Sequence, residues 1–181
     1  WIATGLDFEY WLGVQHSPLF ANSFVVRESD LEDADRRAFL VQYLRGWAMG
    51  LEFAYHNPRA AVESVFEEFP SLASNLGPEL GTTSILQQIN VYRGDMDQRA
   101  GWGDHDVEAW QVFFDTIHEL GQISSAVNAE DYVTNELIAE ANDFDRDQVK
   151  ADAEAYTLSE ELEAVDVEEI QAHLFDQAVS D

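Results

Sequence analysis

The chain of 181 residues has no cysteine, only four prolines and a single lysine, Lys150. Without cysteine it can form no disulfide, no thiolate zinc site and no cysteine nucleophile. Its apolar runs all fall short of the roughly 18 residues that a membrane-spanning helix requires.

Positive charge is also scarce. The sequence holds 36 Asp and Glu against 9 Lys and Arg, which gives a formal net charge of -27. Such a surface repels phosphate backbones and anionic lipid headgroups, so nucleic acid is not expected as a partner. At about 1 M salt the screening length falls to about 3 Å, which relieves the self-repulsion of such a chain. We therefore hypothesise a halophilic source.

Apolar residues are plentiful enough to build a core. They make up 46% of the sequence, and aromatic residues make up 12%. This composition argues against wholesale disorder despite the charge. The length fits one domain, or one domain and part of another.

Helical periodicity dominates the middle of the chain. The β-branched segment 22–28 predicts a strand, and Ser29 with Glu32 has the spacing of a capping box for a helix over 33–56. Asn57 and Pro58 predict a new helix, as cap and first helical residue. We further expect Pro70 to end that helix, a turn at Gly77-Pro78, a helix over 80–92, and a loop over 93–103. Asp104 should cap a helix that Gly121 ends.

The composition changes at residue 128. Residues 1–127 carry a net charge of -12, and the 54 residues after them carry -15. Short helices are predicted near 131–142, from about 147, and after a cap at 157–160. We expect this acidic segment to be solvated and peripheral.

Taken in order, five motifs resemble the C-terminal half of a known family. These are the substrate-binding proteins of ABC importers for nitrate, sulfonates, taurine and thiamine-pyrimidine precursors. The motifs are the strand 23–27, the aromatic-glycine helix 39–47, the helix-Asn-Pro-helix break 55–62, the helix 110–123 and the segment 131–138.

The resemblance implies an α/β fold of the periplasmic-binding-protein type II class, with two lobes around a cleft. This piece of it is expected to be predominantly helical, with a few strands near its N-terminus. Residues 1–22 would then end the second lobe and cross the hinge, 23–127 would form the C-terminal part of the first lobe, and 128–181 an acidic helical tail. Much of the cleft would lie in sequence that precedes Trp1.

The family also implies a function. The chain, or the longer protein of which it is a fragment, would capture a small nutrient and deliver it to an ABC permease at the membrane. Its location would be extracytoplasmic, periplasmic or at the cell surface, and lipid-anchored as members often are. Catalysis is not expected, and no cofactor is implied.

The family places the stretch before the strand near the cleft, which makes Phe8, Glu9, Tyr10 and Trp11 the candidate ligand-binding residues. Stacked rings beside a carboxylate suit a planar cationic or polar heterocycle. The scarcity of Lys and Arg likewise favours a heteroaromatic ligand over nitrate or a sulfonate. The alternative is that these rings simply fill the core of a lobe.

Metal and catalytic signatures are absent from the sequence. Its five histidines form no zinc-type pair, and neither a phosphate-binding loop nor a nucleophile elbow occurs. Acids at 143, 145, 147 and 154 have the spacing of a calcium loop, but Gln148 stands where that loop needs glycine. Asp145 with Gln148 fits a helix cap better.

Two other functions stay open. One is an enzyme on the same scaffold, similar to the thiamine-pyrimidine synthase, although that enzyme is associated with a cysteine-rich motif that this chain lacks. The other is an acidic helical interaction module without a small ligand.

Overall fold

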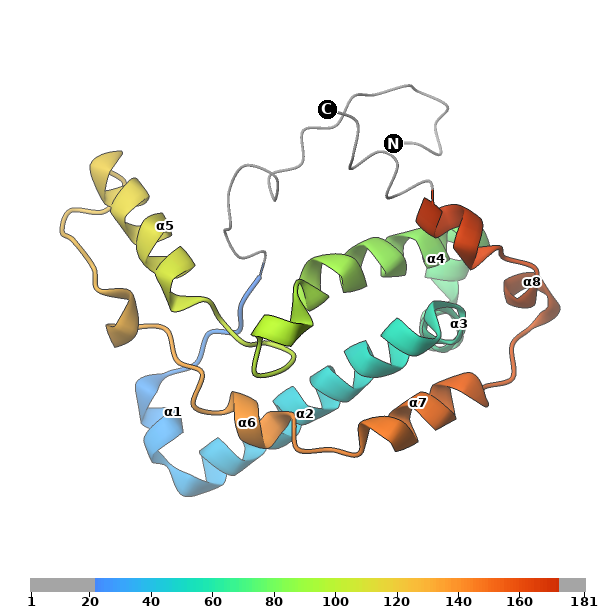
Figure 1. Cartoon of the computed structure of the whole chain (residues 1–181), viewed down its shortest axis with the longest axis horizontal. Helices are drawn as coiled ribbons and strands as arrows, with labels where there is room; N and C mark the ends of the chain where they lie inside the picture. The colour runs from blue at the N-terminus through green and yellow to red at the C-terminus, as the bar shows by residue number, and fades with distance from the viewer. Residues whose placement is uncertain (1–21, 173–181) are drawn as a thin grey trace. The chain divides into compact units, whose positions relative to one another are not determined.

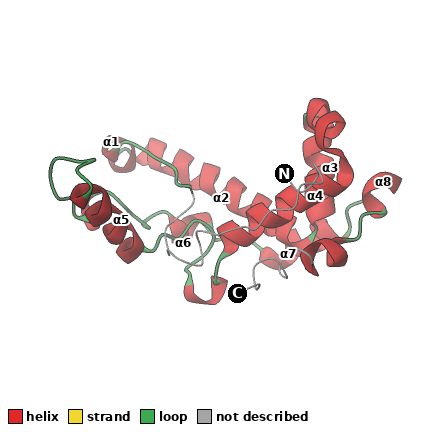
Figure 2. Ribbon diagram, turned by 90° about the horizontal axis from the view of Figure 1, so that it is seen from above, coloured by secondary structure: helices red, strands yellow, loops and turns green. Residues whose placement is uncertain are grey.

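The computed structural model describes residues 22–172, which fold into helices joined by loops (Figure 1). None of these residues forms a strand (Figure 2). None of the helices in this range is long and apolar enough to cross a membrane. The elements are α1 (Glu28–Glu32), α2 (Ala34–His56), α3 (Pro58–Glu68), α4 (Pro70–Arg93), η3 (Met96–Gln98), α5 (Val107–Glu119), η4 (Ala129–Asp131), α6 (Ile138–Ala141), α7 (Arg146–Glu154) and α8 (Glu160–Glu163).

The strand predicted over residues 23–27 does not form. Residues 22–27 are irregular, and Val25 in their middle is 92% exposed. A strand needs a neighbouring strand to satisfy its backbone groups, and the described residues supply none. The segment is held instead through Phe24, whose ring meets Tyr43 and Trp47 of α2 edge-on at centroid distances of 5.6 and 5.3 Å.

Two of the predicted helix caps belong to other residues. Asp33, not Ser29, caps α2, because its Oδ1 accepts hydrogen bonds from the amides of Asp35 and Arg36 at 3.0 and 2.9 Å. Likewise Asp106, not Asp104, caps α5, and its Oδ1 accepts from the Ala109 amide at 3.0 Å. Several carboxylates lie within a few residues of the start of each helix, and their spacing alone does not predict which of them caps it.

The cap at Asn57 is confirmed. Its side-chain oxygen accepts from the Ala60 amide at 3.0 Å, and Pro58 occupies the first turn of α3. Gly77 has φ 70° and interrupts α4, so the predicted turn is a break between two helical segments. Gly121, at φ 71°, follows the end of α5 as predicted.

The described residues divide into two compact units, each assembled from separate stretches of chain. Unit 1 contains residues 49–94 and 144–172, and unit 2 contains residues 22–48 and 95–143. Helix α2 contributes its C-terminal part to unit 1 and its N-terminal part to unit 2. The predicted boundaries at residues 22 and 127 refer to lobes of the family and stay a prediction.

Unit 1 is built on the packing of α3 against α4, with α8 against both (Figure 1). A close approach at Gly81 fixes this arrangement. A Cβ there would lie 2.8 Å from Phe66 Cζ and 3.0 Å from Val62 Cγ1. The α3 residues Ala60 and Val62 and the α4 residues Leu86 and Ile89 are buried at this interface and nearby. A side chain at residue 81 would therefore require Phe66 or Val62 to shift.

Unit 2 is held together by amide side chains that bind backbone groups far away in sequence. Asn142 accepts from the Trp102 amide at 2.8 Å and donates to the Trp102 carbonyl at 3.0 Å. Asn135 does the same for both backbone groups of His105, at 2.9 and 2.8 Å. Each asparagine side chain thus satisfies one backbone amide and one backbone carbonyl, as a neighbouring strand would. Together the two asparagines connect the loop before α5 to residues 135–142.

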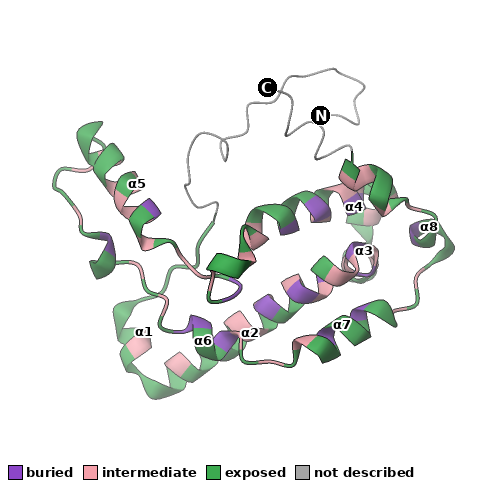
Figure 3. Ribbon diagram, viewed as in Figure 1, coloured by how far each residue is buried: buried purple, intermediate pink, exposed green. Residues whose placement is uncertain are grey.

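The acidic segment from residue 128 is not peripheral, contrary to the prediction. Residues 129–143 belong to unit 2 and residues 144–172 to unit 1. The segment buries Ala141, Ala153 and Leu162 at 1%, 0% and 2% exposure. Figure 3 shows buried positions on α6, α7 and α8, with exposed positions between them. Its described acids are exposed. Its buried residues, which contribute to the cores of both units, are all apolar.

Candidate functional site

The residues predicted to bind ligand, Phe8, Glu9, Tyr10 and Trp11, lie outside the described residues. Their role therefore stays a prediction. Among the described residues, two features of unit 1 and one of unit 2 bring polar or titratable side chains together. They are a pocket, a buried glutamate and a half-buried histidine.

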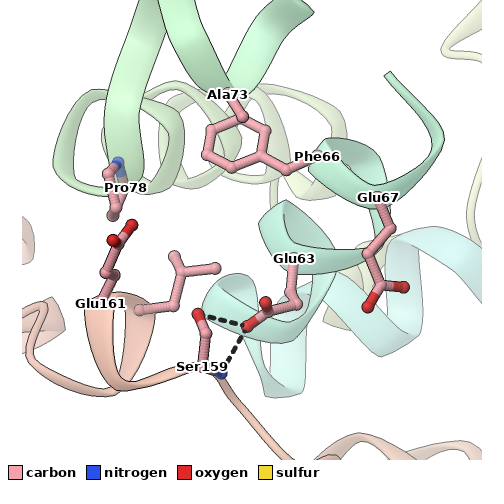
Figure 4. Close-up of a pocket in the computed structure, with 8 residues that line it drawn as sticks. Glu63, Phe66, Glu67, Ala73, Pro78, Ser159 and Glu161 are labelled. Carbon is pink, nitrogen blue, oxygen red and sulfur yellow. Dashed lines mark hydrogen bonds between the residues drawn. The ribbon is translucent and has the colours of Figure 1, made fainter. Parts of the chain in front are cut away.

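The pocket lies in unit 1 between α3, α4 and α8 (Figure 4). Its volume is about 410 Å³, and it is open to solvent on one side. Apolar walls and carboxylates both contribute to its surface. It is lined by Glu63, Phe66, Glu67, Ala73, Pro78, Ser159, Glu161 and Leu162.

One hydrogen-bonded pair shapes the rim of the pocket. The Glu63 carboxylate accepts from the Ser159 amide at 2.8 Å and from the Ser159 hydroxyl at 3.0 Å (Figure 4). This bond positions the first turn of α8, whose Leu162 is 2% exposed against the apolar side. Ser159 was predicted within a capping motif, but its hydroxyl makes no cap bond and is used in this tertiary contact instead.

Charge decides what the pocket can accept. Glu67 and Glu161 are exposed acidic residues that line the pocket together with Phe66, and the lining contains no basic side chain. A nitrate or sulfonate would meet only repulsion here. A neutral or cationic molecule with a flat apolar face would find a ring and carboxylates together.

Sequence reasoning missed this pocket. Glu67 and Glu161 are exposed acids next to further glutamates, a pattern that is typical of a solvated helix face. The local signal was the placing of Phe66 beside Glu63 and Glu67 on α3. The rest of the pocket depends on contacts with α4 and α8, which no local pattern predicts.

Glu52 is the most buried carboxylate in the described range, at 6% exposure. Arg146 Nη1 donates to its Oε2 at 2.7 Å, and His56 Nε2 lies 3.2 Å from its Oε1. The Arg146 guanidinium also lies 5.4 Å from the centre of the Phe144 ring. A buried carboxylate needs such partners, because an unpaired charge in a core is strongly destabilising. The cluster therefore fastens α7 to α2 within unit 1.

The third feature is His105 in unit 2. Its Nδ1 accepts a hydrogen bond from Trp110 Nε1 at 3.3 Å, and the two rings meet edge-on. Burial lowers the pKa of His105 below its ordinary value, and nearby Arg99 lowers it further, while Asp104 acts in the opposite direction. The imidazole is thus held in its neutral form.

The part of the chain that the structure describes contains no cluster of side chains that could hold a metal ion. No three His, Asp or Glu side chains in residues 22–172 are placed to hold an ion. In the calcium-like stretch Asp145 caps α7, as predicted, and its Oδ1 accepts from the Gln148 amide at 2.9 Å. Of the remaining acids of that stretch, Asp143 precedes α7, Asp147 lies in its first turn and Glu154 is its last residue.

Comparison of the chain with protein families, curated proteins and solved structures gave no match. Function must therefore be argued from the residues and their contacts.

Proposed function

We propose that this chain is the solute-binding component of an ABC importer, or a fragment of that component. It would capture a small nutrient, for which a thiamine-pyrimidine-like heterocycle is the first choice and a sulfonate or nitrate the second. Ligand would bind the closed form of two lobes better than the open form, and the closed form would dock on the permease.

The observation that carries the proposal is a contact between two of the family-like motifs. The ring of Phe24, in the strand-like motif, meets Tyr43 and Trp47 of the aromatic-glycine helix. The two motifs follow one another along the chain, and their aromatic rings pack together. In the family they lie in the same lobe, so this contact supports the resemblance.

An exposed aromatic patch on unit 2 supports the same proposal. It consists of Phe24, Phe39 and Tyr43, which are 47%, 63% and 51% exposed. The rings of Phe39 and Tyr43 are stacked with their centroids 6.4 Å apart. A cluster of this kind suits the interface between a helix and a sheet, which the rest of a lobe would provide.

The preferred ligand class follows from charge. The pocket of unit 1 has acidic and aromatic walls, and the predicted ligand-binding residues combine Glu9 with three rings. Anion recognition uses arginine or helix amino termini, and neither site offers an arginine. A heterocycle that carries amino groups matches both sites better.

Thermal stability with ligands present tests the proposal. The chain would be heated in about 2 M KCl, where charge repulsion is screened, with a pyrimidine, a sulfonate, nitrate or no addition. We expect the pyrimidine to raise the melting temperature. Both Trp11→Ala and Glu9→Gln should remove that rise, and Tyr132→Ala, which truncates an aromatic residue that is 74% exposed, should keep it.

Two results would count against the proposal. If no compound of the three classes changes the melting temperature, the interaction module without a small ligand is favoured. If Trp11→Ala and Glu9→Gln respond to the ligand as the unaltered chain does, the predicted site is wrong even though binding occurs.

A further inference from the structure

The contact between His105 and Trp110 connects the loop before α5 with the first turns of that helix. Trp110 can only donate through its indole nitrogen, so His105 Nδ1 must be unprotonated to accept this bond. The 3.3 Å contact therefore requires a neutral imidazole with its proton on Nε2. A protonated imidazole would place a second donor against the indole N–H.

The backbone of His105 is fixed independently of its ring. Asn135 holds both the amide and the carbonyl of His105, at 2.9 and 2.8 Å. Its ring therefore cannot move away from Trp110 without a rotation of the side chain or a break in the asparagine contact. Protonation of the imidazole should therefore break the contact with Trp110, while the backbone of His105 stays in place.

Charges around the ring do not favour the protonated form. On the loop side Arg99 opposes a positive imidazole and Asp104 favours it. Arg99 donates to the backbone carbonyl of Asp104 at 2.6 Å, which keeps its positive charge in this loop. From α5 the ring contacts the uncharged Trp110. Asn135, which is also uncharged, binds the backbone of His105. None of the ion pairs found in the described residues involves His105.

Trp110 also belongs to a row of aromatic rings. It lies 6.1 Å from Phe113 and 5.7 Å from Phe114, and Phe114 lies 6.5 Å from Tyr132. The row runs from α5 to the segment that contains η4. A displacement of Trp110 would therefore disturb the ring contacts within α5 and, through Phe114, the contact with Tyr132.

We propose that the His105–Trp110 hydrogen bond is a pH-sensitive latch, which fastens α5 to the loop 99–106 at neutral pH and opens when the imidazole is protonated. The latch does not depend on the proposed transport function. Because the folded protein favours neutral His105, the latch is closed above the ordinary histidine range and is lost as pH falls below it.

Hydrogen exchange measured by mass spectrometry tests the latch. Exchange would be followed at about pH 7.5 and about pH 4.5, above and well below the ordinary histidine pKa, because the pKa of His105 is lowered, and corrected for the intrinsic rates. We expect the amides of residues 99–111 and 128–137 to lose protection at the lower pH. His118→Gln, an exposed histidine on the same helix, should show the same loss.

Two variants isolate the bond. His105→Gln cannot be protonated, and Trp110→Phe keeps a ring but has no donor. In both, protection of these segments should no longer differ between the two pH values, provided that circular dichroism shows retained helix. If His105→Gln and Trp110→Phe keep the full pH response, the latch is wrong. Nitrogen NMR that finds Nδ1 protonated near neutral pH would also overturn it.

Discussion

Neutral amides and arginines make most of the long-range polar contacts among the described residues, and many of these contacts end on backbone groups. Gln111 donates to the Val127 carbonyl and accepts from the Ala129 amide, at 2.9 and 2.8 Å. Arg45 donates to the Glu140 carbonyl at 2.7 Å, and Arg59 to the Glu163 carbonyl at 3.0 Å. Hydrogen bonds to uncharged carbonyls lose less in concentrated salt than exposed ion pairs do. Such contacts fit a protein whose charge demands screening.

An exposed ion pair accompanies one of these contacts. Arg37 Nη2 donates to Glu140 Oε1 at 2.7 Å, and this bond lowers the pKa of the Glu140 carboxyl. Its contribution to stability is therefore present above the ordinary glutamate range and is lost as pH falls through the lowered pKa. Because both side chains are exposed, salt screens most of the effect.

Gly101 is predicted to be intolerant of a side chain. A Cβ at this position would overlap the amide group of Asn142, which holds both backbone groups of Trp102. We expect Gly101→Ala to destabilise the fold by about 1–3 kcal/mol, because the asparagine must shift and lose its bonds. The readout is thermal unfolding in concentrated salt.

Gly46 provides the matched control. It lies inside α2, and a Cβ there would meet nothing within 4 Å. Gly46→Ala should stabilise the protein by about 0.5–1 kcal/mol, since alanine has the higher helix propensity. Equal melting temperatures for the two variants would show that Asn142 does not restrict residue 101.

At the scale of elements, the sequence correctly predicted the helix boundaries that depend on neighbouring residues. The Asn57-Pro58 start, the Gly77 break, the Asp145 cap and the Gly121 stop all depend on residues a few positions apart. The caps at Asp33 and Asp106 were missed because nearby residues offer equivalent oxygens. Segment 22–27 has strand-like composition but lacks a pairing partner among the described residues, and pairing is a property of the whole sheet.

The candidate sites depend on contacts between residues that are far apart in the sequence, which local patterns do not predict. The candidate ligand residues came from a resemblance, and they lie outside the described residues. The pocket of unit 1 could not be predicted, because Ser159 and Glu63 meet only after α8 packs on α3. The role of Asn57 beyond its cap was likewise hidden, since the carbonyl of Ala153 comes close only in the folded chain.

Substitution of Asn57 should therefore destabilise the protein more than the loss of an ordinary helix cap does. Besides capping α3, its Nδ2 donates to the Ala153 carbonyl at the end of α7, at 2.8 Å. We expect Asn57→Ala to destabilise by about 2 kcal/mol, the sum of a cap and a tertiary hydrogen bond. Asp145→Ala removes only a cap and should cost about 1 kcal/mol. An Asn57→Ala loss no larger than that of Asp145→Ala, in thermal unfolding, would argue against the bridging role.

At the scale of the whole molecule, the net charge of -27 governs the conditions under which the chain folds. Of the described acids only Glu52 is buried. Six of the eight arginines are engaged in hydrogen bonds, ion pairs or ring contacts. Few cations are left to offset the repulsion between carboxylates. Dissolved salt must provide that screening.

Unfolding at low salt is the expected outcome. The helical signal in circular dichroism should be strong at about 2 M KCl and should fall as salt is lowered to about 0.01 M, where the screening length reaches about 30 Å. The melting temperature should fall with it. Sucrose at matched viscosity serves as a control for general solvent exclusion. Equal stability at low and high salt would contradict the hypothesis of a halophilic source.

The account rests most heavily on the binding of a small nutrient, and calorimetric titration tests it most directly. A thiamine-pyrimidine-like heterocycle would be titrated into the folded chain at about 2 M KCl, where exposed charges are screened. We predict saturable heat with one molecule bound per chain, and binding that is tighter than that of a sulfonate or nitrate. A folded chain that gives no saturable heat with any of the three classes would contradict the proposed function.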